Sequence, residues 1–245
     1  MKTVLASALL LLITSTAGAA GMSVTYEVNG NPYEGYYVSP SAKAPLVVII
    51  HDWDGLTDYE ITRANMLAER GYAAFAADLF GAGVRPATTE ERRRLTGEIG
   101  SDSARMRALV QGALDAARSK GANVQNAVLM GYCFGGAPVL DFARSGANLK
   151  GFVTFHGRLK TPEGQDYSKA GGHVLVFHGT ADTSITMDQF AQLARELEAD
   201  GVMHEMTTYS GAPHAFTVFG TDRYREDADK KSWRRFIEFL AEVTD

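Results

Sequence analysis

The chain has 245 residues, of which 45% are hydrophobic, and it carries a formal net charge of −5 and one cysteine. A chain of this length can bury one sizeable core, so we expect a single globular domain. The negative charge and the lack of a basic stripe argue against a nucleic-acid partner.

The first nineteen residues have the features of a secretory signal peptide. Lys2 supplies a positive charge, residues 4–14 form an apolar segment, and Ala17-Gly18-Ala19 is a small-residue cleavage site. The apolar segment has about half of the roughly 20 residues that span a bilayer, which argues against a membrane anchor. We therefore expect residues 1–19 to be a signal peptide and residues 20–245 to be an exported, periplasmic or secreted domain without a membrane segment.

Strand and helix patterns alternate along the rest of the chain. Residues 24–28 and 33–38 flank an Asn-Gly turn, which predicts a β-hairpin at the edge of a sheet. Short apolar runs predict further strands at residues 46–50, 73–77, 127–130, 152–155, 174–177 and 206–209. Helical patterns occupy residues 59–70, 105–118, 137–144, 187–199 and 223–243. This alternation predicts an α/β fold, with a mostly parallel central sheet and helices on both faces.

The stretch Gly131-Tyr132-Cys133-Phe134-Gly135-Gly136 lies between a predicted strand and a predicted helix. This pattern predicts a nucleophile elbow, a sharp strand-to-helix turn that presents a reactive side chain, here Cys133. The flanking glycines suit a strained turn, because a side chain there would strike the neighbouring strand or helix. The start of the helix beside the sulfur favours a thiolate. The alternative is a buried structural cysteine.

A catalytic triad follows from the residues after the strands. Ligand sites of such sheets lie beyond the carboxyl ends of the strands. Asp182 and His214 follow the last two predicted strands, so they are the expected orienting carboxylate and base for Cys133. The order Cys133, Asp182, His214 is that of the α/β-hydrolase fold. The backbone N–H groups of Phe134 and Trp53 are the expected oxyanion donors.

Five motifs spread over the mature chain resemble the dienelactone hydrolase family, the cysteine-dependent branch of the α/β-hydrolases. They are His51-Asp52-Trp53-Asp54-Gly55-Leu56, Ala77-Asp78-Leu79-Phe80, Gly131-Tyr132-Cys133-Phe134-Gly135-Gly136, His178-Gly179-Thr180-Ala181-Asp182 and Gly211-Ala212-Pro213-His214-Ala215-Phe216. The resemblance implies an α/β-hydrolase fold and hydrolysis of a small-molecule ester or lactone. It also implies Cys133, Asp182 and His214 as the triad, a thioester intermediate and no cofactor.

Other roles depend on the resemblance and on departures from it. Family members carry a carboxylate, commonly Glu, that holds the resting thiol, and Asp52 stands at that position. Members that act on the carboxylate-bearing dienelactone use two arginines. Arg94 is the closest match to one of them, and Thr217 stands near the place of the other. We expect Arg94, Arg85 and His156 to be candidate substrate contacts, for a substrate that need not be dienelactone.

Two other functions are compatible with the same residues. Four histidines and two aspartates follow the predicted strands and suggest a metal-dependent hydrolase, although closely spaced ligand pairs are absent; they are His51, His156, His178, His214, Asp52 and Asp182. A non-catalytic periplasmic binding protein on the same fold is the second alternative. We expect a thiol-dependent enzyme without a metal, and a monomer.

Overall fold

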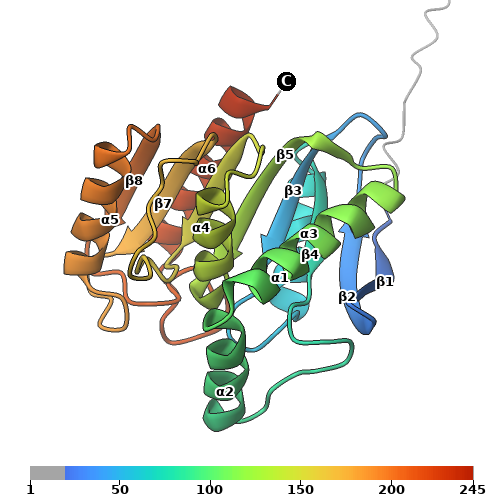
Figure 1. Ribbon diagram of the computed structural model, residues 1–245, viewed down its shortest axis with the longest axis horizontal. Coiled ribbons are helices and arrows are strands. Elements are labelled where there is room, and N and C mark those ends of the chain that lie inside the picture. Colours follow the sequence, from blue (N-terminus) through green and yellow to red (C-terminus); the bar gives the residue numbers. More distant parts are fainter. Residues whose placement is uncertain (1–19, 245) are drawn as a thin grey trace, which may run out of the picture.

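One sheet runs through residues 20–244, which are the residues that the computed structural model describes (Figure 1). Its eight strands lie in the order β1-β2-β4-β3-β5-β6-β7-β8. They are β1 (Met22–Val28), β2 (Asn31–Val38), β3 (Pro45–Ile50), β4 (Ala73–Ala77), β5 (Asn123–Tyr132), β6 (Gly151–Phe155), β7 (His173–Gly179) and β8 (His204–Tyr209). Neighbouring strands from β4 to β8 pair in parallel, and β2 pairs antiparallel with β4.

Within the described residues, six α-helices and one short 3₁₀ turn accompany the sheet. They are α1 (Asp58–Ala68), α2 (Thr89–Gly100), α3 (Ser103–Ser119), η1 (Cys133–Gly135), α4 (Gly136–Arg144), α5 (Met187–Ala199) and α6 (Glu226–Val243). Val48 of β3 belongs to the core cluster with α3, α4 and α5, whereas Val47 belongs to the cluster with α1 and α6. The sheet is therefore buried on both faces, and the predicted α/β architecture is confirmed.

The edge hairpin is confirmed as well. Strands β1 and β2 pair antiparallel around Asn29 and Gly30. Both residues have positive φ angles, 51° and 77°, as a two-residue hairpin turn requires. The signal peptide predicted for residues 1–19 lies outside the described residues. Within residues 20–244, no helix is both long and apolar enough to cross a bilayer.

Helix α2 is an element that the sequence patterns did not predict. Its inward face buries only Thr96 and Ile99, so its apolar periodicity is weak. A capping box begins the helix, in which Thr88 and Glu91 each accept a hydrogen bond from the other residue's backbone N–H. Figure 1 shows α2 beyond the carboxyl ends of the strands, the end at which the expected catalytic residues lie.

A buried ion pair joins α1 to α6 and holds the loop after β8. Arg63 is 1% exposed and contacts Asp229, which is also buried. The guanidinium lies 4.2 Å from the ring centroid of Phe219 and 4.9 Å from that of Trp233. It also donates to the carbonyl oxygen of Thr217 at 2.9 Å. The buried guanidinium of Arg63 therefore helps to hold the loop that carries His214.

The turn after β5 leaves no room for side chains at its glycines. Cys133 has a φ of 47°, in the left-handed region that L-residues rarely adopt. A Cβ atom on Gly131 would lie 2.4 Å from the carbonyl oxygen of Gly135. One on Gly135 would lie 2.6 Å from the carbonyl oxygen of Ile50. The steric reason for the glycines on both sides of Cys133 is thus confirmed.

We predict that Gly135→Ala lowers the free energy of unfolding by about 1–3 kcal/mol. The added Cβ atom would collide with the backbone at the end of β3, which cannot shift without disturbing the sheet. Urea unfolding followed by circular dichroism measures this change. Gly97→Ala is the matched control, since a Cβ atom at Gly97 in α2 meets nothing within 4 Å. We expect the control to raise the stability by up to about 1 kcal/mol. Equal losses in both variants would contradict the close-packing argument.

Candidate active site

Three side chains that are far apart in the sequence meet at the carboxyl ends of β5, β7 and β8. Cys133 follows β5, Asp182 lies in the loop after β7, and His214 lies in the loop after β8. Nε2 of His214 is 3.0 Å from Sγ of Cys133. Nδ1 of the same ring is 2.7 Å from Oδ2 of Asp182. One imidazole therefore bridges the thiol and the carboxylate that the sequence singled out.

The carboxylate of Asp182 is fixed at both oxygens. Oδ1 accepts hydrogen bonds from the backbone N–H groups of Ser184 at 2.8 Å and Ile185 at 2.9 Å, and Oδ2 faces His214. Burial raises the pKa of Asp182, but the hydrogen bonds from His214 and these amides outweigh it and hold the pKa below its ordinary value. An ionised Asp182 keeps a proton on Nδ1 of His214, which leaves Nε2 free to accept a proton from the thiol.

The resting thiol of Cys133 is protonated. Burial raises its pKa well above the ordinary value, and the charge and hydrogen bond of the nearby Asp52 raise it further. The backbone N–H of Phe134 lowers the pKa but does not outweigh these effects. The expectation that the helix start favours a thiolate therefore does not hold for this state. The short turn η1 separates Cys133 from α4, and an anionic neighbour opposes a second negative charge.

Asp52 contacts both the thiol and one of the expected oxyanion donors. It is only 7% exposed, and Oδ1 of its carboxylate accepts a hydrogen bond from the backbone N–H of Trp53. The same carboxylate hydrogen-bonds to Cys133. The N–H of Trp53, an expected oxyanion donor, is thus already bonded to Asp52. This coupling between the gate and the oxyanion donor was not foreseen from the sequence.

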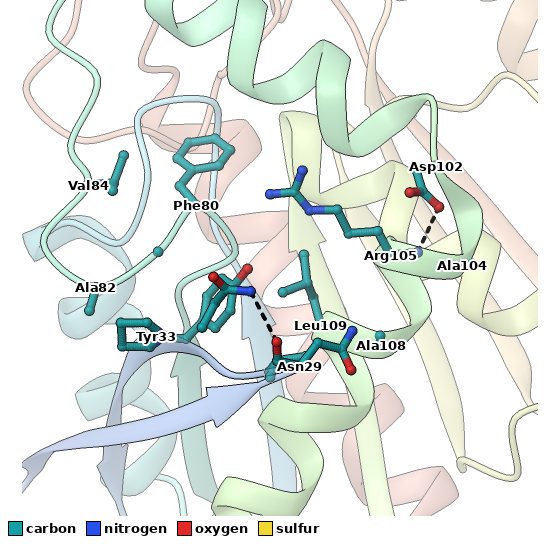
Figure 2. A pocket seen from close by; sticks show the side chains of 14 residues that line it. Asn29, Tyr33, Phe80, Ala82, Val84, Asp102, Ala104, Arg105, Ala108 and Leu109 are labelled. Carbon is teal, nitrogen blue, oxygen red and sulfur yellow. Dashed lines mark hydrogen bonds between the residues drawn. The ribbon is translucent and has the colours of Figure 1, made fainter.

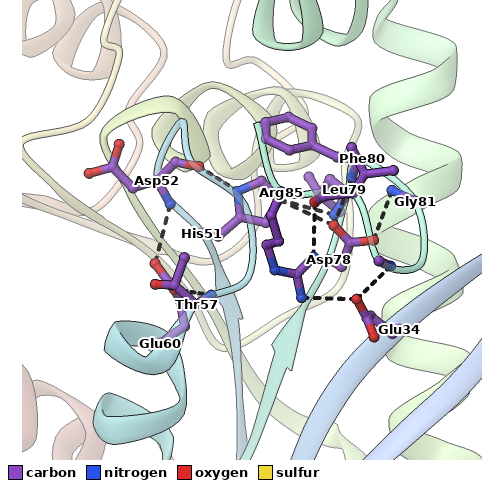
Figure 3. A network of polar contacts seen from close by, with 12 residues as sticks. Glu34, His51, Asp52, Thr57, Glu60, Asp78, Leu79, Phe80, Gly81 and Arg85 are labelled. Carbon is purple, nitrogen blue, oxygen red and sulfur yellow. Dashed lines mark hydrogen bonds and ion pairs between the residues drawn. The ribbon is translucent and has the colours of Figure 1, made fainter. Parts of the chain in front are cut away.

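Two buried side chains hold the loop that carries Asp52 (Figure 3). Nδ1 of His51 donates to the carbonyl oxygen of Asp52, and Nε2 of His51 accepts from the backbone N–H of Leu79 at 3.1 Å. Burial lowers the pKa of His51 to about 4. Glu60 accepts from the N–H of Thr57 at 2.9 Å and from the N–H of Asp52 at 3.4 Å. The sequence analysis did not single out Glu60, although its spacing from Thr57 is that of a capping box.

Two of the expected substrate contacts have carboxylate partners on the surface, and their assignment stays a prediction. Arg94 has a side chain that is 58% exposed and pairs with Glu98 at 2.8 Å, one turn along α2. Arg85 pairs at 2.9 Å with Glu34 of the edge hairpin (Figure 3). Each guanidinium already has a carboxylate partner, so neither supports recognition of a substrate anion. Arg92, which was not singled out, instead lies over the ring of Trp53.

His156 contacts the catalytic base rather than open space. It is fully buried, with a φ of 42°, and its Nε2 lies 2.8 Å from Oγ1 of Thr217. Its ring packs edge-on against that of His214, with centroids 5.4 Å apart. Burial lowers the pKa of His156 well below its ordinary value, so the ring is neutral. In this placement His156 packs against His214, and its assignment as a substrate contact stays a prediction.

The histidines do not converge on a common point. His51 is occupied by backbone groups, and His178 stacks on Phe190 with ring centroids 5.4 Å apart. Among residues 20–244, no three His, Cys, Asp or Glu side chains are arranged to hold a metal ion. The residues that suggested a metal-dependent hydrolase therefore serve the packing of strand ends and the Cys133–His214–Asp182 contact.

Known proteins are similar to this chain in fold and in sequence. Residues 33–244 match the model of the dienelactone hydrolase family. A Salmonella typhimurium protein named "Putative carboxymethylenebutenolidase" is 26% identical, over 94% of this chain and 91% of its own. A crystal structure titled as a dienelactone hydrolase-like promiscuous phosphotriesterase from metagenomic libraries is 27% identical with a TM-score of 0.85, over 94% of this chain and all of its own. A structure titled m3DLH is 30% identical with a TM-score of 0.87 over the same shares. The chain therefore belongs to the dienelactone hydrolase family.

Proposed function

We propose that the chain hydrolyses carboxylic esters or lactones with Cys133 as the nucleophile, His214 as the base and Asp182 as the orienting carboxylate. The observation that carries the proposal is the 3.0 Å contact between Nε2 of His214 and Sγ of Cys133. A nucleophile in hydrogen-bond reach of an oriented base is what covalent hydrolysis requires. Membership of the dienelactone hydrolase family supports the same reaction class.

Acylation begins with proton transfer from Cys133 to His214. The sulfur then attacks the carbonyl carbon, a C–S bond forms, and negative charge develops on the carbonyl oxygen. The N–H groups of Phe134 and Trp53 stabilise this oxygen once Asp52 has moved off the Trp53 N–H. Collapse breaks the bond to the alcohol oxygen, which takes the proton from His214. A lactone opens in this step and keeps its new hydroxyl on the acyl group.

Deacylation regenerates the thiol. Water attacks the thioester carbonyl while His214 accepts one of its protons, and the same two N–H groups hold the oxygen. Collapse breaks the C–S bond, the carboxylic acid leaves, and His214 returns its proton to the sulfur of Cys133. No electron transfer or cofactor enters this sequence of steps.

The proposed substrate does not need to carry a carboxylate. Arg85 and Arg94 are paired on the surface, and Thr217 has its side chain bonded to His156. The groups that would grip the carboxylate of dienelactone are therefore not assembled at these positions. We propose a neutral ester or lactone as the preferred class, and an aryl phosphotriester belongs in the test panel because one structural relative is titled a phosphotriesterase.

We predict that Cys133→Ala lowers kcat/KM for p-nitrophenyl acetate by about a thousandfold or more, because the atom that forms the covalent bond is gone. Iodoacetamide abolishes the wild-type activity with one label per chain, since Cys133 is the only cysteine. Acid-quenched mass spectrometry detects an acetyl thioester on the wild type and none on the variant. The panel adds a neutral lactone, a carboxylate-bearing lactone and an aryl phosphotriester.

The alternatives give different results in the same assays. Activity that survives alkylation but is lost with a chelator indicates a metal-dependent hydrolase. A folded wild-type protein that turns over no member of the panel indicates a binding protein. An unaltered rate in Cys133→Ala rules out the thiol mechanism.

We predict that Asp52→Asn shifts the pH profile of iodoacetamide labelling at Cys133 to lower pH. The carboxylate raises the thiol pKa, so its removal increases the thiolate fraction at neutral pH. The rate of label incorporation from pH 6 to about 10 measures this shift. Asp54→Asn is the matched control, because Asp54 is a neighbouring carboxylate that makes no hydrogen bond to the thiol. Identical profiles in wild type and Asp52→Asn would disprove the gating role.

A further inference from the structure

A cleft opens at the edge of the sheet, apart from the contact between Cys133 and His214. It has a volume of about 790 Å³ and lies between the β1–β2 turn, the loop after β4 and the first turns of α3 (Figure 2). None of Cys133, Asp182 and His214 lines it. Ligand pockets in proteins have volumes of roughly 300–1,000 Å³, so the cleft is large enough for a small molecule.

The cleft contains one arginine without a charged partner. Figure 2 shows the side chain of Arg105 extending from α3 over Leu109 towards Phe80. Its backbone N–H donates to Asp102, but within residues 20–244 its guanidinium has no ion pair or hydrogen bond. The other two arginines of α3 each have an ion-pair partner: Arg107 pairs with Asp141, and Arg118 pairs with Asp115. A guanidinium without an ion-pair partner, on a half-buried side chain that lines a cleft, can bind an anion.

The lining of the cleft exposes somewhat more polar than apolar surface, and four side chains contribute to the apolar part. Tyr33 and Phe80 supply aromatic rings, and Val84 and Leu109 supply aliphatic surface. Val84 is 36% exposed, which is high for a valine in a folded domain. Tyr33, Phe80 and Leu109 are themselves almost fully buried, so the apolar surface that a ligand can cover in the cleft is mainly that of Val84.

We propose that this cleft binds a small monocarboxylate, whose carboxylate contacts Arg105. The planar guanidinium fork fits a carboxylate with two parallel hydrogen bonds. A single negative charge matches the single free arginine, whereas a dianion would also meet the carboxylate of Asp102 at the rim. Asn29 and Asn31 add amide groups on the opposite side of the cleft.

One wall of the cleft, the ring of Phe80, contacts residues that are next to the proposed catalytic site in the sequence. The ring of Phe80 lines the cleft and packs on His51, with centroids 4.5 Å apart, and on Phe134, with centroids 5.6 Å apart. A ligand in the cleft therefore contacts the outer side of this ring and does not reach Cys133. The site is independent of the proposed hydrolysis, and binding is measurable without turnover.

Calorimetric titration of the full chain with phenylacetate tests the proposal, with the neutral phenylacetamide as the paired probe. We expect phenylacetate to bind the wild type and phenylacetamide to bind at least about tenfold more weakly, since a charge-assisted pair is lost. Arg105→Gln weakens phenylacetate by a similar factor. Ala108→Phe, which fills the cleft and keeps Arg105, abolishes binding. Arg118→Gln, on the same helix but outside the cleft, and protein alkylated at Cys133 both bind as the wild type does.

Each contrary result overturns the proposal. Unchanged binding by Arg105→Gln or Ala108→Phe places the ligand elsewhere, and equal loss in Arg118→Gln indicates an unspecific effect of charge. Loss of binding after alkylation places phenylacetate at the catalytic thiol. No binding to the wild type at about 10 mM phenylacetate removes the site. Circular dichroism of each variant separates these outcomes from unfolding.

Discussion

The geometry of the catalytic end depends on how closely the turn after β5 approaches its neighbours. Without side chains at Gly131 and Gly135, the backbone of this turn lies against the end of β3. That approach permits the left-handed conformation of Cys133 and puts its sulfur at hydrogen-bond distance from His214. The strain at one residue is offset by the packing of the sheet on both faces. A rigid framework thus holds the reactive group in a conformation that an isolated peptide would avoid.

The site combines an ionised triad carboxylate with a neutral thiol. Asp182 has three hydrogen bonds, two from backbone amides and one from His214, whereas the charge of Asp52 raises the pKa of the Cys133 thiol. In the proposed mechanism the two carboxylates therefore act in opposite directions: Asp182 orients the base His214, and Asp52 favours the protonated form of Cys133. Because Asp52 also occupies the N–H of Trp53, the two obstacles to reaction are removed by a single side-chain movement.

Sequence patterns predict most of the strands and helices, because the spacing of apolar residues reflects which residues are buried in each element. Aliphatic runs mark buried strands, and parallel strands bring the residues after them to one edge, which is why Cys133, Asp182 and His214 were found together. Helix α2 was missed because polar caps rather than an apolar stripe define it. The surface pairing of Arg85 depends on Glu34, a partner from a distant hairpin. No local pattern shows such contacts, nor that His156 turns inward to Thr217.

The link that His51 makes between β3 and β4 has a consequence for acid resistance. Its Nε2 accepts the N–H of Leu79 only while the ring is neutral. The pKa of His51 is about 4 in the fold against 6.5 for an exposed imidazole, so the unfolded chain takes up this proton first. The contribution of His51 to stability is complete above about pH 6.5 and is lost as the pH falls to about 4. Acidification therefore loosens the anchorage of the loop bearing Asp52 and Trp53.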